Sequence, residues 1–186
     1  DSSYETPNLQ FHVQPLSLDK FGDPLHGFPG LTASVCNLNP QSRGSVHIVS
    51  KDNKEAPSID PRYLSEEQDR IVAAQSIRLA RKIISQPAMK KYNPIEHAPG
   101  IQFQSDDDIK KVAGDIGTTI FHPVGTCAMG SNSSSVTDPQ LRVRGIEGLR
   151  VVDASIMPTV TSGNTNAPTL MIAEKASEMI LNSSKF

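Results

Sequence analysis

Alternation of apolar and polar residues predicts short strands in the first part of the chain. Leu9, Phe11 and Val13 alternate with polar neighbours, which is the period-two pattern of a half-buried strand. A second alternating run covers residues 31–36, and an apolar run at residues 45–49 follows a turn-rich connection. We predict that these last two runs form a hairpin-like antiparallel pair, with one face toward a core and the other toward solvent or a ligand.

A long helix is predicted from Ser65 to Gln86. Apolar residues recur there at helical spacing, and Pro87 forbids continuation. Ser65 followed by Gln68 is typical of a capping box, which marks a helix start. The basic residues of this helix are expected on its solvated side; they are Arg70, Arg78, Arg81 and Lys82.

A second helix is predicted to begin at Ser105. The serine can cap the helix, and the three aspartates that follow complement the positive end of the helix dipole. Their spacing lacks the alternating ligands and turn glycine of a calcium loop, so we interpret them as a helix start. No metal site is predicted anywhere in the chain.

The C-terminal part combines a short strand with a third helix. Residues 149–152 are largely apolar and predict a buried strand that ends at Asp153, where open α/β sheets bind nucleotides. The last helix is predicted to start near Asn166, with Pro168 in its first turn, and to be mostly buried because its apolar face is broad. The predicted fold class is therefore α+β (α/β), with an antiparallel sheet covered by helices on one face and a C-terminal strand and helix.

Composition excludes several functions without choosing one. The chain has 186 residues, a net charge of -2 and 37% hydrophobic residues, which fits one or two folded domains. It offers no electrostatic footprint for nucleic acid and no apolar run long enough to span a membrane. Cys36 and Cys127 form neither a disulfide framework nor a metal cluster, and their count suits a reducing compartment, so a cytoplasmic location is expected.

The most informative stretch is FHPVGTCAMG, residues 121–130. Pro123 biases His122 toward extended geometry, so the backbone aims the imidazole. Gly125 and Gly130 permit positive φ or close approach. From these ten residues alone, His122 is equally well read as a satisfied core histidine or as a catalytic base.

A second stretch changes that balance. GLRVVDASIMP at residues 148–158 is followed by TSGNTNAPTLMIAEK at residues 161–175. Together with residues 121–130, it resembles the C-terminal signature of the glucose-methanol-choline family of FAD-dependent alcohol oxidoreductases, in a form close to choline dehydrogenases. The resemblance runs from about Asn39 to the end of the chain, and residues 8–13 also resemble the family's substrate domain.

The resemblance implies a role for each site residue. It places His122 over the flavin, facing the substrate hydroxyl, and we carry the family's second catalytic position to Asn164. Asn166 and Ala167 are expected at a helix start beside the pyrimidine end of the flavin, while Asp153 and Ala154 approach the ribityl and pyrophosphate part. Without the resemblance, Asn164 after Gly163 would be read as a turn residue.

The chain also departs from the family pattern. It contains no Gly-x-Gly-x-x-Gly dinucleotide fingerprint, which the family carries near its N-terminus. It therefore looks like the C-terminal part of a larger flavoenzyme, in which FAD is bound mainly by the absent N-terminal domain and the fragment alone is inactive. Residues 1–120 would form part of the substrate domain and residues 121–186 a catalytic segment that completes the FAD domain. Ala128 stands where many relatives have a basic or bulky residue.

Two classes of function follow. In the first, the chain is the catalytic portion of an enzyme that oxidises a small primary alcohol, choline-like or generic, to the aldehyde by hydride transfer to FAD, with the electron acceptor unknown. In the second, it is a non-catalytic binding domain, and a non-redox lyase of the same family lies between them. Choline needs a cation-accepting pocket, and the chain has no Trp and few aromatic residues, so a generic alcohol ranks at least as high.

Overall fold

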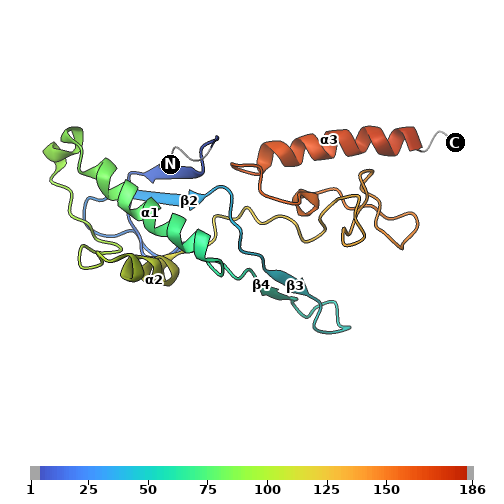
Figure 1. Ribbon diagram of the computed structural model, residues 1–186, viewed down its shortest axis with the longest axis horizontal. Coiled ribbons are helices and arrows are strands. Elements are labelled where there is room, and N and C mark those ends of the chain that lie inside the picture. The colour runs from blue at the N-terminus through green and yellow to red at the C-terminus, as the bar shows by residue number, and fades with distance from the viewer. Residues whose placement is uncertain (1–4, 184–186) are drawn as a thin grey trace. The chain divides into compact units, whose positions relative to one another are not determined.

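The computed structural model describes residues 5–183 and shows a mixed arrangement of helices and small antiparallel sheets (Figure 1), so the predicted α+β class is confirmed. Contacts within the chain divide the described residues into two compact units. The first unit holds residues 5–37 and 63–118, and the second holds residues 38–62 and 119–183. Residues 38–62 thus group with the C-terminal segment, and the functional division at residue 120 stays a prediction.

The first unit is built from regular elements. β1 (Leu9–Gln14) pairs antiparallel with β2 (Thr32–Asn37), in a register that sets Leu9 opposite Asn37. α1 (Glu67–Ile84) packs against β2 and against α2 (Asp106–Ile116) (Figure 1). A 3-10 helix, η1 (Pro87–Tyr92), follows α1. The buried apolar residues lie on the two helices; they are Val72, Ala74, Ile109, Val112 and Ala113.

The strand pairing differs from the predicted hairpin. β3 (Ser45–His47) pairs with β4 (Ser58–Asp60) in the second unit, whereas β2 pairs with β1. The prediction that residues 31–36 and 45–49 form one pair was therefore wrong. Alternation identifies a strand, but it does not name the partner, because both partners present the same period-two pattern.

Of the two predicted serine caps at helix starts, the structure confirms one and contradicts the other. Ser105 is the N-cap of α2, and its hydroxyl accepts a hydrogen bond from the Asp108 backbone N–H at 3.1 Å. α1 begins later than predicted, with Glu66 as N-cap and no side-chain cap. The predicted capping box at Ser65 is therefore not formed, and the Ser65 carbonyl accepts a hydrogen bond from the Arg70 guanidinium at 2.8 Å.

Arg81 is also placed differently from the prediction. Its side chain is only 21% exposed and pairs with the Glu96 carboxylate, with nitrogen to oxygen distances of 2.8 and 2.9 Å. The same guanidinium donates to the Phe103 and Gly100 carbonyls at 2.9 and 3.1 Å. Arg81 therefore fixes the segment that follows η1 to α1, and it does not belong to a solvated face.

The second unit has little regular structure outside α3 (Asn166–Ser183). A core of Leu141, Ile156, Met157, Ile172 and Ala176 joins this helix to η2 (Ala154–Ile156), a single 3-10 turn. The predicted strand at residues 149–152 is not formed, since only an isolated bridge between Arg142 and Arg150 is present there. Short runs of apolar residues do not distinguish a strand from a packed irregular segment.

α3 is less buried than its composition predicts. Leu170 is 64% exposed and Met171 is 60% exposed, whereas Ile172 and Ala176 are buried. The expectation that the helix is mostly buried is therefore wrong for this chain, because η2 is the main element packed against it among the described residues. None of the helices in residues 5–183 is both long and apolar enough to cross a membrane.

Candidate functional site

His122 lies in an irregular segment whose backbone is sharply turned just before it. Phe121 has a positive φ of 63°, a conformation that is uncommon for a bulky residue, and its N–H donates to the Thr119 hydroxyl at 3.0 Å. Pro123 follows directly, and the His122 side chain is half-buried. The turn before the histidine and the proline after it restrict the path of the backbone on both sides, and the turn at Phe121 was not part of the prediction.

Both nitrogens of the His122 ring meet residues at the start of α3. Nε2 lies 3.1 Å from the side-chain amide nitrogen of Asn164, and Nδ1 lies 2.9 Å from the hydroxyl oxygen of Thr165. The backbone N–H of Thr165 also faces Nδ1, at a longer distance of 3.5 Å. Thr165 is buried, with 8% of its surface exposed, whereas Asn164 is exposed. The Nδ1 side of the ring is thus held from within the protein, and the amide partner of Nε2 is open to solvent.

These contacts bear on which ring nitrogen carries the proton. A hydroxyl can donate or accept, and an Asn amide presents a donor on one side and an acceptor on the other. In the observed geometry the Asn164 amide nitrogen faces Nε2, which suits a neutral ring with its lone pair on Nε2, and the amide would have to turn its oxygen to Nε2 to satisfy an imidazolium. When Nδ1–H donates to the Thr165 hydroxyl oxygen, the lone pair is on Nε2, which is the nitrogen beside exposed Asn164.

The loop that carries His122 is held by backbone hydrogen bonds to η2. The Cys127 N–H donates to the Ser155 carbonyl at 3.0 Å, and the Met129 N–H donates to the Ile156 carbonyl at 2.8 Å. Gly125 has a φ of +90°, and a Cβ at that position would lie 3.4 Å from the Met157 carbonyl oxygen. The contact distance itself is ordinary, but a side chain there is strained by the positive φ, so the prediction that Gly125 permits positive φ is supported.

Asp153 and Ala154 lie at the start of the segment that holds this loop. The Asp153 carboxylate accepts a hydrogen bond from the Ser155 N–H at 2.8 Å and so caps η2. Asp153 is exposed, whereas Ala154 is half-buried and packs against the core of the second unit. Asp153 therefore stands at the N-terminus of a 3-10 turn, which corrects its predicted place at the end of a strand.

Asn166 and Ala167 are the first two residues of α3, as predicted, and both are exposed. The Thr165 carbonyl accepts the first hydrogen bond of the helix, from the Thr169 N–H at 3.0 Å. Pro168 has no N–H, so the third helical position offers no donor for a capping side chain. The Thr165 hydroxyl is directed to His122 instead.

Thr165 is the site residue that the sequence reasoning missed. No role is predicted for it from the sequence, although it lies between Asn164 and Asn166. The combination of a hydroxyl residue just before a helix with a proline at the third helical position could have indicated a hydroxyl with a partner elsewhere. The structure brings His122, Asn164 and Thr165 together, and it places Asp153 with Ala154 on the segment that supports them.

The cysteines do not add a second reactive centre. Burial raises the pKa of the Cys36 thiol above its ordinary value, although the backbone hydrogen bond to Gln10 acts in the opposite direction. A raised pKa lowers the fraction of thiolate, which is the nucleophilic form. Cys127 is half-buried, and its backbone N–H is part of the frame just described.

Comparison with known proteins gives consistent matches. The family model described as GMC oxidoreductase matches residues 40–173. An alcohol dehydrogenase [acceptor] of Pseudomonas putida is 45% identical over 95% of this chain, and an oxygen-dependent choline dehydrogenase of Chromohalobacter salexigens is 43% identical over 95% of it. The chain spans about a third of the length of each of these relatives, 32% in both cases.

Solved structures agree with the sequence relatives. A pyridoxine 4-oxidase matches with a TM-score of 0.85 at 29% identity, covering 92% of this chain and 34% of that protein. A formate oxidase matches with a TM-score of 0.80 at 28% identity, covering 90% of this chain and 30% of that protein. Since the family model covers well over half of the residues, the chain belongs to the GMC oxidoreductase family.

Proposed function

We propose that this chain is the C-terminal substrate-binding and catalytic part of an FAD-dependent oxidoreductase that converts a primary alcohol to its aldehyde. The observation that carries the proposal is the arrangement around His122, in which Nδ1 meets the buried Thr165 hydroxyl and Nε2 meets exposed Asn164. Relatives named as alcohol and choline dehydrogenases support the same chemistry. The relatives' greater length supports an N-terminal FAD domain in the complete enzyme.

The proton of the substrate hydroxyl is the part of the reaction that these residues would handle. A substrate hydroxyl would replace the Asn164 amide N–H as the donor to Nε2 and give its proton to His122, and that amide N–H would then donate to the substrate oxygen as its negative charge grows. The imidazolium that results is stabilised by donation from Nδ1–H to the Thr165 hydroxyl. FAD, when bound, supplies the acceptor for the hydride that leaves the carbon.

The residues at the start of α3 fit a bound flavin. Asn166 and Ala167 are exposed at the N-terminus of an 18-residue helix, whose positive end favours negative charge. Asp153 is exposed on η2, where its carboxylate can accept hydrogen bonds from a sugar or ribityl chain, and Ala154 leaves room beside it because it has no long side chain. We assign these four residues to FAD contacts, with the pyrophosphate site in the N-terminal domain.

The test is anaerobic mixing of the complete flavoenzyme with alcohol. A straight-chain primary alcohol and choline would be compared, while flavin absorbance is followed by stopped flow and the aldehyde is measured after quenching. Bleaching of the flavin with one aldehyde formed per flavin supports the proposal. Product formation without flavin reduction would indicate a lyase, and absence of both would indicate a binding domain. The relative rates of the two substrates decide between a choline-type and a generic alcohol enzyme.

A further inference from the structure

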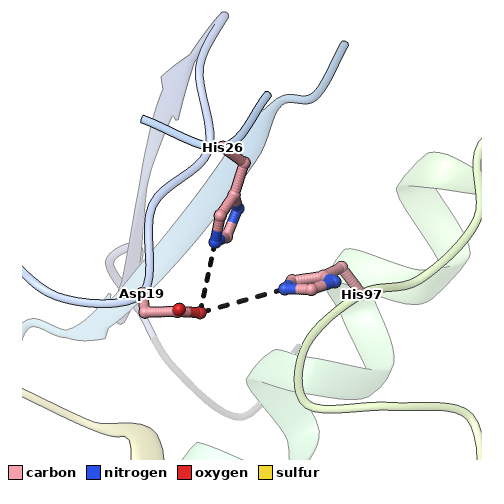
Figure 2. A group of neighbouring side chains, drawn as sticks. All are labelled: Asp19, His26 and His97. Atoms are coloured by element: carbon pink, nitrogen blue, oxygen red, sulfur yellow. Dashed lines mark ion pairs between the residues drawn. The ribbon is translucent and has the colours of Figure 1, made fainter. Parts of the chain in front are cut away.

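Three side chains with metal-binding atoms meet in the first unit, whereas the residues of the proposed reaction belong to the second unit. Asp19 and His26 belong to the connection between β1 and β2, and His97 belongs to the segment after η1 (Figure 2). One carboxylate oxygen and one nitrogen of each imidazole all lie within 4.8 Å of one another. In Figure 2 both rings turn a nitrogen toward the Asp19 carboxylate.

The spacing is close to that of a coordination sphere. His26 Nε2 lies 3.4 Å from an Asp19 carboxylate oxygen, and His97 Nε2 lies 3.9 Å from the same oxygen. Ligand atoms bonded tetrahedrally to zinc are roughly 3.3 Å apart, as follows from metal–ligand bonds of about 2.0–2.1 Å. The ligand atoms of Asp19 and His26 already have this spacing. The His97 side chain is 54% exposed, so its ring can rotate to shorten the distance between its Nε2 and the Asp19 carboxylate.

His26 is oriented as a metal ligand before any metal binds. Its Nδ1 lies 2.9 Å from the Ser17 hydroxyl oxygen, and its backbone N–H donates to the Ser17 carbonyl at 2.9 Å. Donation from Nδ1–H to Ser17 leaves the lone pair on Nε2, which faces Asp19. Metal-binding histidines are commonly fixed through the other ring nitrogen in this way. The ring also stacks on Phe28 at 4.8 Å, and the His26 side chain is only 17% exposed.

Glu96, the residue before His97, is held in place by hydrogen bonds. Glu96 is paired with Arg81 of α1 through both carboxylate oxygens, and one of these oxygens accepts the Gly100 N–H at 3.0 Å. This anchors the backbone beside His97 while its ring stays exposed. The two histidine rings meet edge to face with centroids 4.9 Å apart. The backbone is therefore held in place, and the remaining adjustment is a rotation of one ring.

We propose that Asp19, His26 and His97 form a binding site for a divalent transition metal ion, zinc being the one assigned. Two imidazole nitrogens and a carboxylate oxygen are a donor set that suits zinc, whereas magnesium and calcium prefer oxygen ligands alone. Three protein ligands leave a fourth position for water. The Asp19 side chain is 72% exposed, so the site takes up and releases metal from solvent and joins two loops that are far apart in sequence.

The test is titration of metal-free protein, without an affinity tag, with zinc chloride in an isothermal calorimeter. The parent protein is expected to bind one zinc ion in addition to any bound at unrelated sites. His97→Ala is expected to lose that ion, because it removes a ligand from an exposed position without disturbing the core. Ser17→Ala is expected to weaken binding by about 10- to 100-fold, the usual effect of removing a partner that orients a metal ligand. Thermal melting of each metal-free variant verifies that folding is intact.

His47→Ala is the matched control, since His47 is an exposed histidine of β3 in the other unit. It should bind zinc like the parent. The proposal is overturned if the parent binds no zinc, if His97→Ala binds zinc as tightly as the parent, or if magnesium competes at equal concentration. In each of those cases the three side chains do not form the proposed zinc site.

Discussion

The two units of this chain position their side chains by different means. In the first unit, α1, α2 and the β1–β2 sheet present apolar residues at regular spacing, and the buried apolar residues lie on two helices. In the second unit, the loop of His122 is held by individual backbone hydrogen bonds to η2, and its core of five residues joins η2 to α3. Residues proposed to carry chemistry thus lie where regular structure is scarce, which is typical of functional loops supported by a small rigid scaffold.

The largest effect is expected at the centre of the second unit. In the complete flavoenzyme, His122→Ala should slow flavin reduction by alcohol by about 10²–10⁴-fold, because it removes the proposed general base. Reoxidation by an artificial acceptor should change far less. Stopped-flow bleaching, normalised to flavin content, measures the effect. If the normalised rate falls by less than about threefold, the decrease is far smaller than the loss of a general base would cause, and another group accepts the proton.

Two core substitutions compare the units directly. Ile156 and Ile109 are 1% and 0% exposed, and each Ile→Ala change should lower the free energy of unfolding by about 2–5 kcal/mol. Ile156→Ala should also slow turnover per bound flavin, because loss of the buried side chain loosens the packing of η2, whose backbone carbonyls hold the Cys127 and Met129 N–H groups of the His122 loop. Ile109→Ala should leave that turnover near the parent value. If both substitutions slow turnover equally, the geometry around His122 depends on the packing of both units and not on that of the second unit alone. Denaturant melts paired with normalised rates give both quantities.

A substitution of Asn164 tests whether a residue other than His122 contributes to the reaction. Asn164→Ala should slow flavin reduction by about 10- to 100-fold, the effect of losing one hydrogen bond to a charged oxygen. Flavin content and melting temperature should stay close to the parent, since the side chain is exposed. Rapid-scan absorbance measures the rate of flavin reduction, and a thermal melt on the same sample measures stability, so an effect on catalysis is distinguished from an effect on folding. Loss of folding with normal turnover in the surviving fraction would instead identify Asn164 as a turn residue.

Thr165 is expected to act through His122 and not on substrate. Thr165→Val keeps the volume but removes the hydroxyl oxygen that accepts from Nδ1–H, so the tautomer with its lone pair on Nε2 is no longer favoured. Flavin reduction should slow by about tenfold, the worth of one neutral hydrogen bond. Thr165→Ser should recover most of the rate because it restores the oxygen. If both variants are equally slow, the threonine methyl matters for packing and the hydroxyl does not orient the ring. The rate of flavin reduction is measured by stopped flow as a function of pH for the parent and for both variants.

The smallest effect is expected on the surface of the first unit. Hydrogen bonds from Lys110 of α2 and from Arg70 hold the pKa of the Glu67 carboxyl below its ordinary value. This contribution to stability is present above the unfolded pKa of about 4.3 and is lost as pH falls through the lower folded pKa. Glu67 in turn raises the pKa of Lys110, and that contribution is lost as pH rises through the raised value.

Glu67→Gln should therefore lower stability slightly at neutral pH and reduce the loss of stability on acidification. Urea midpoints at neutral and acidic pH measure both changes, which should be small because exposed ion pairs contribute little. Glu178→Gln serves as the control, since it removes an exposed pair with Lys175 within α3 and joins no second element. An unchanged acid dependence in Glu67→Gln would show that the bridge between α1 and α2 does not form in solution.

Local patterns predicted the regular elements well and their partners poorly. Ser105 with its three aspartates marked the start of α2, and Pro87 marked the end of α1, because caps and helix breakers act within a few residues. The strand at residues 45–49 was found, but its partner was not, since pairing depends on contacts distant in sequence. Arg81 was assigned to solvent because its partner Glu96 lies outside the helix that carries it.

The sequence by itself determined the family resemblance, the FAD expectation and the choice of His122 and Asn164, because these rest on motifs of adjacent residues and on chemistry that each side chain carries alone. The tertiary structure decided that His122 meets Asn164 and Thr165, that Asp153 caps a 3-10 turn, and that Asp19, His26 and His97 meet. The physical reason is that hydrogen bonds and metal coordination depend on distances of a few ångströms between atoms. His122 and Asn164 are 42 positions apart and carry no local signal of such a distance, and a pattern of nearby residues does not give the exact geometry of closer pairs either.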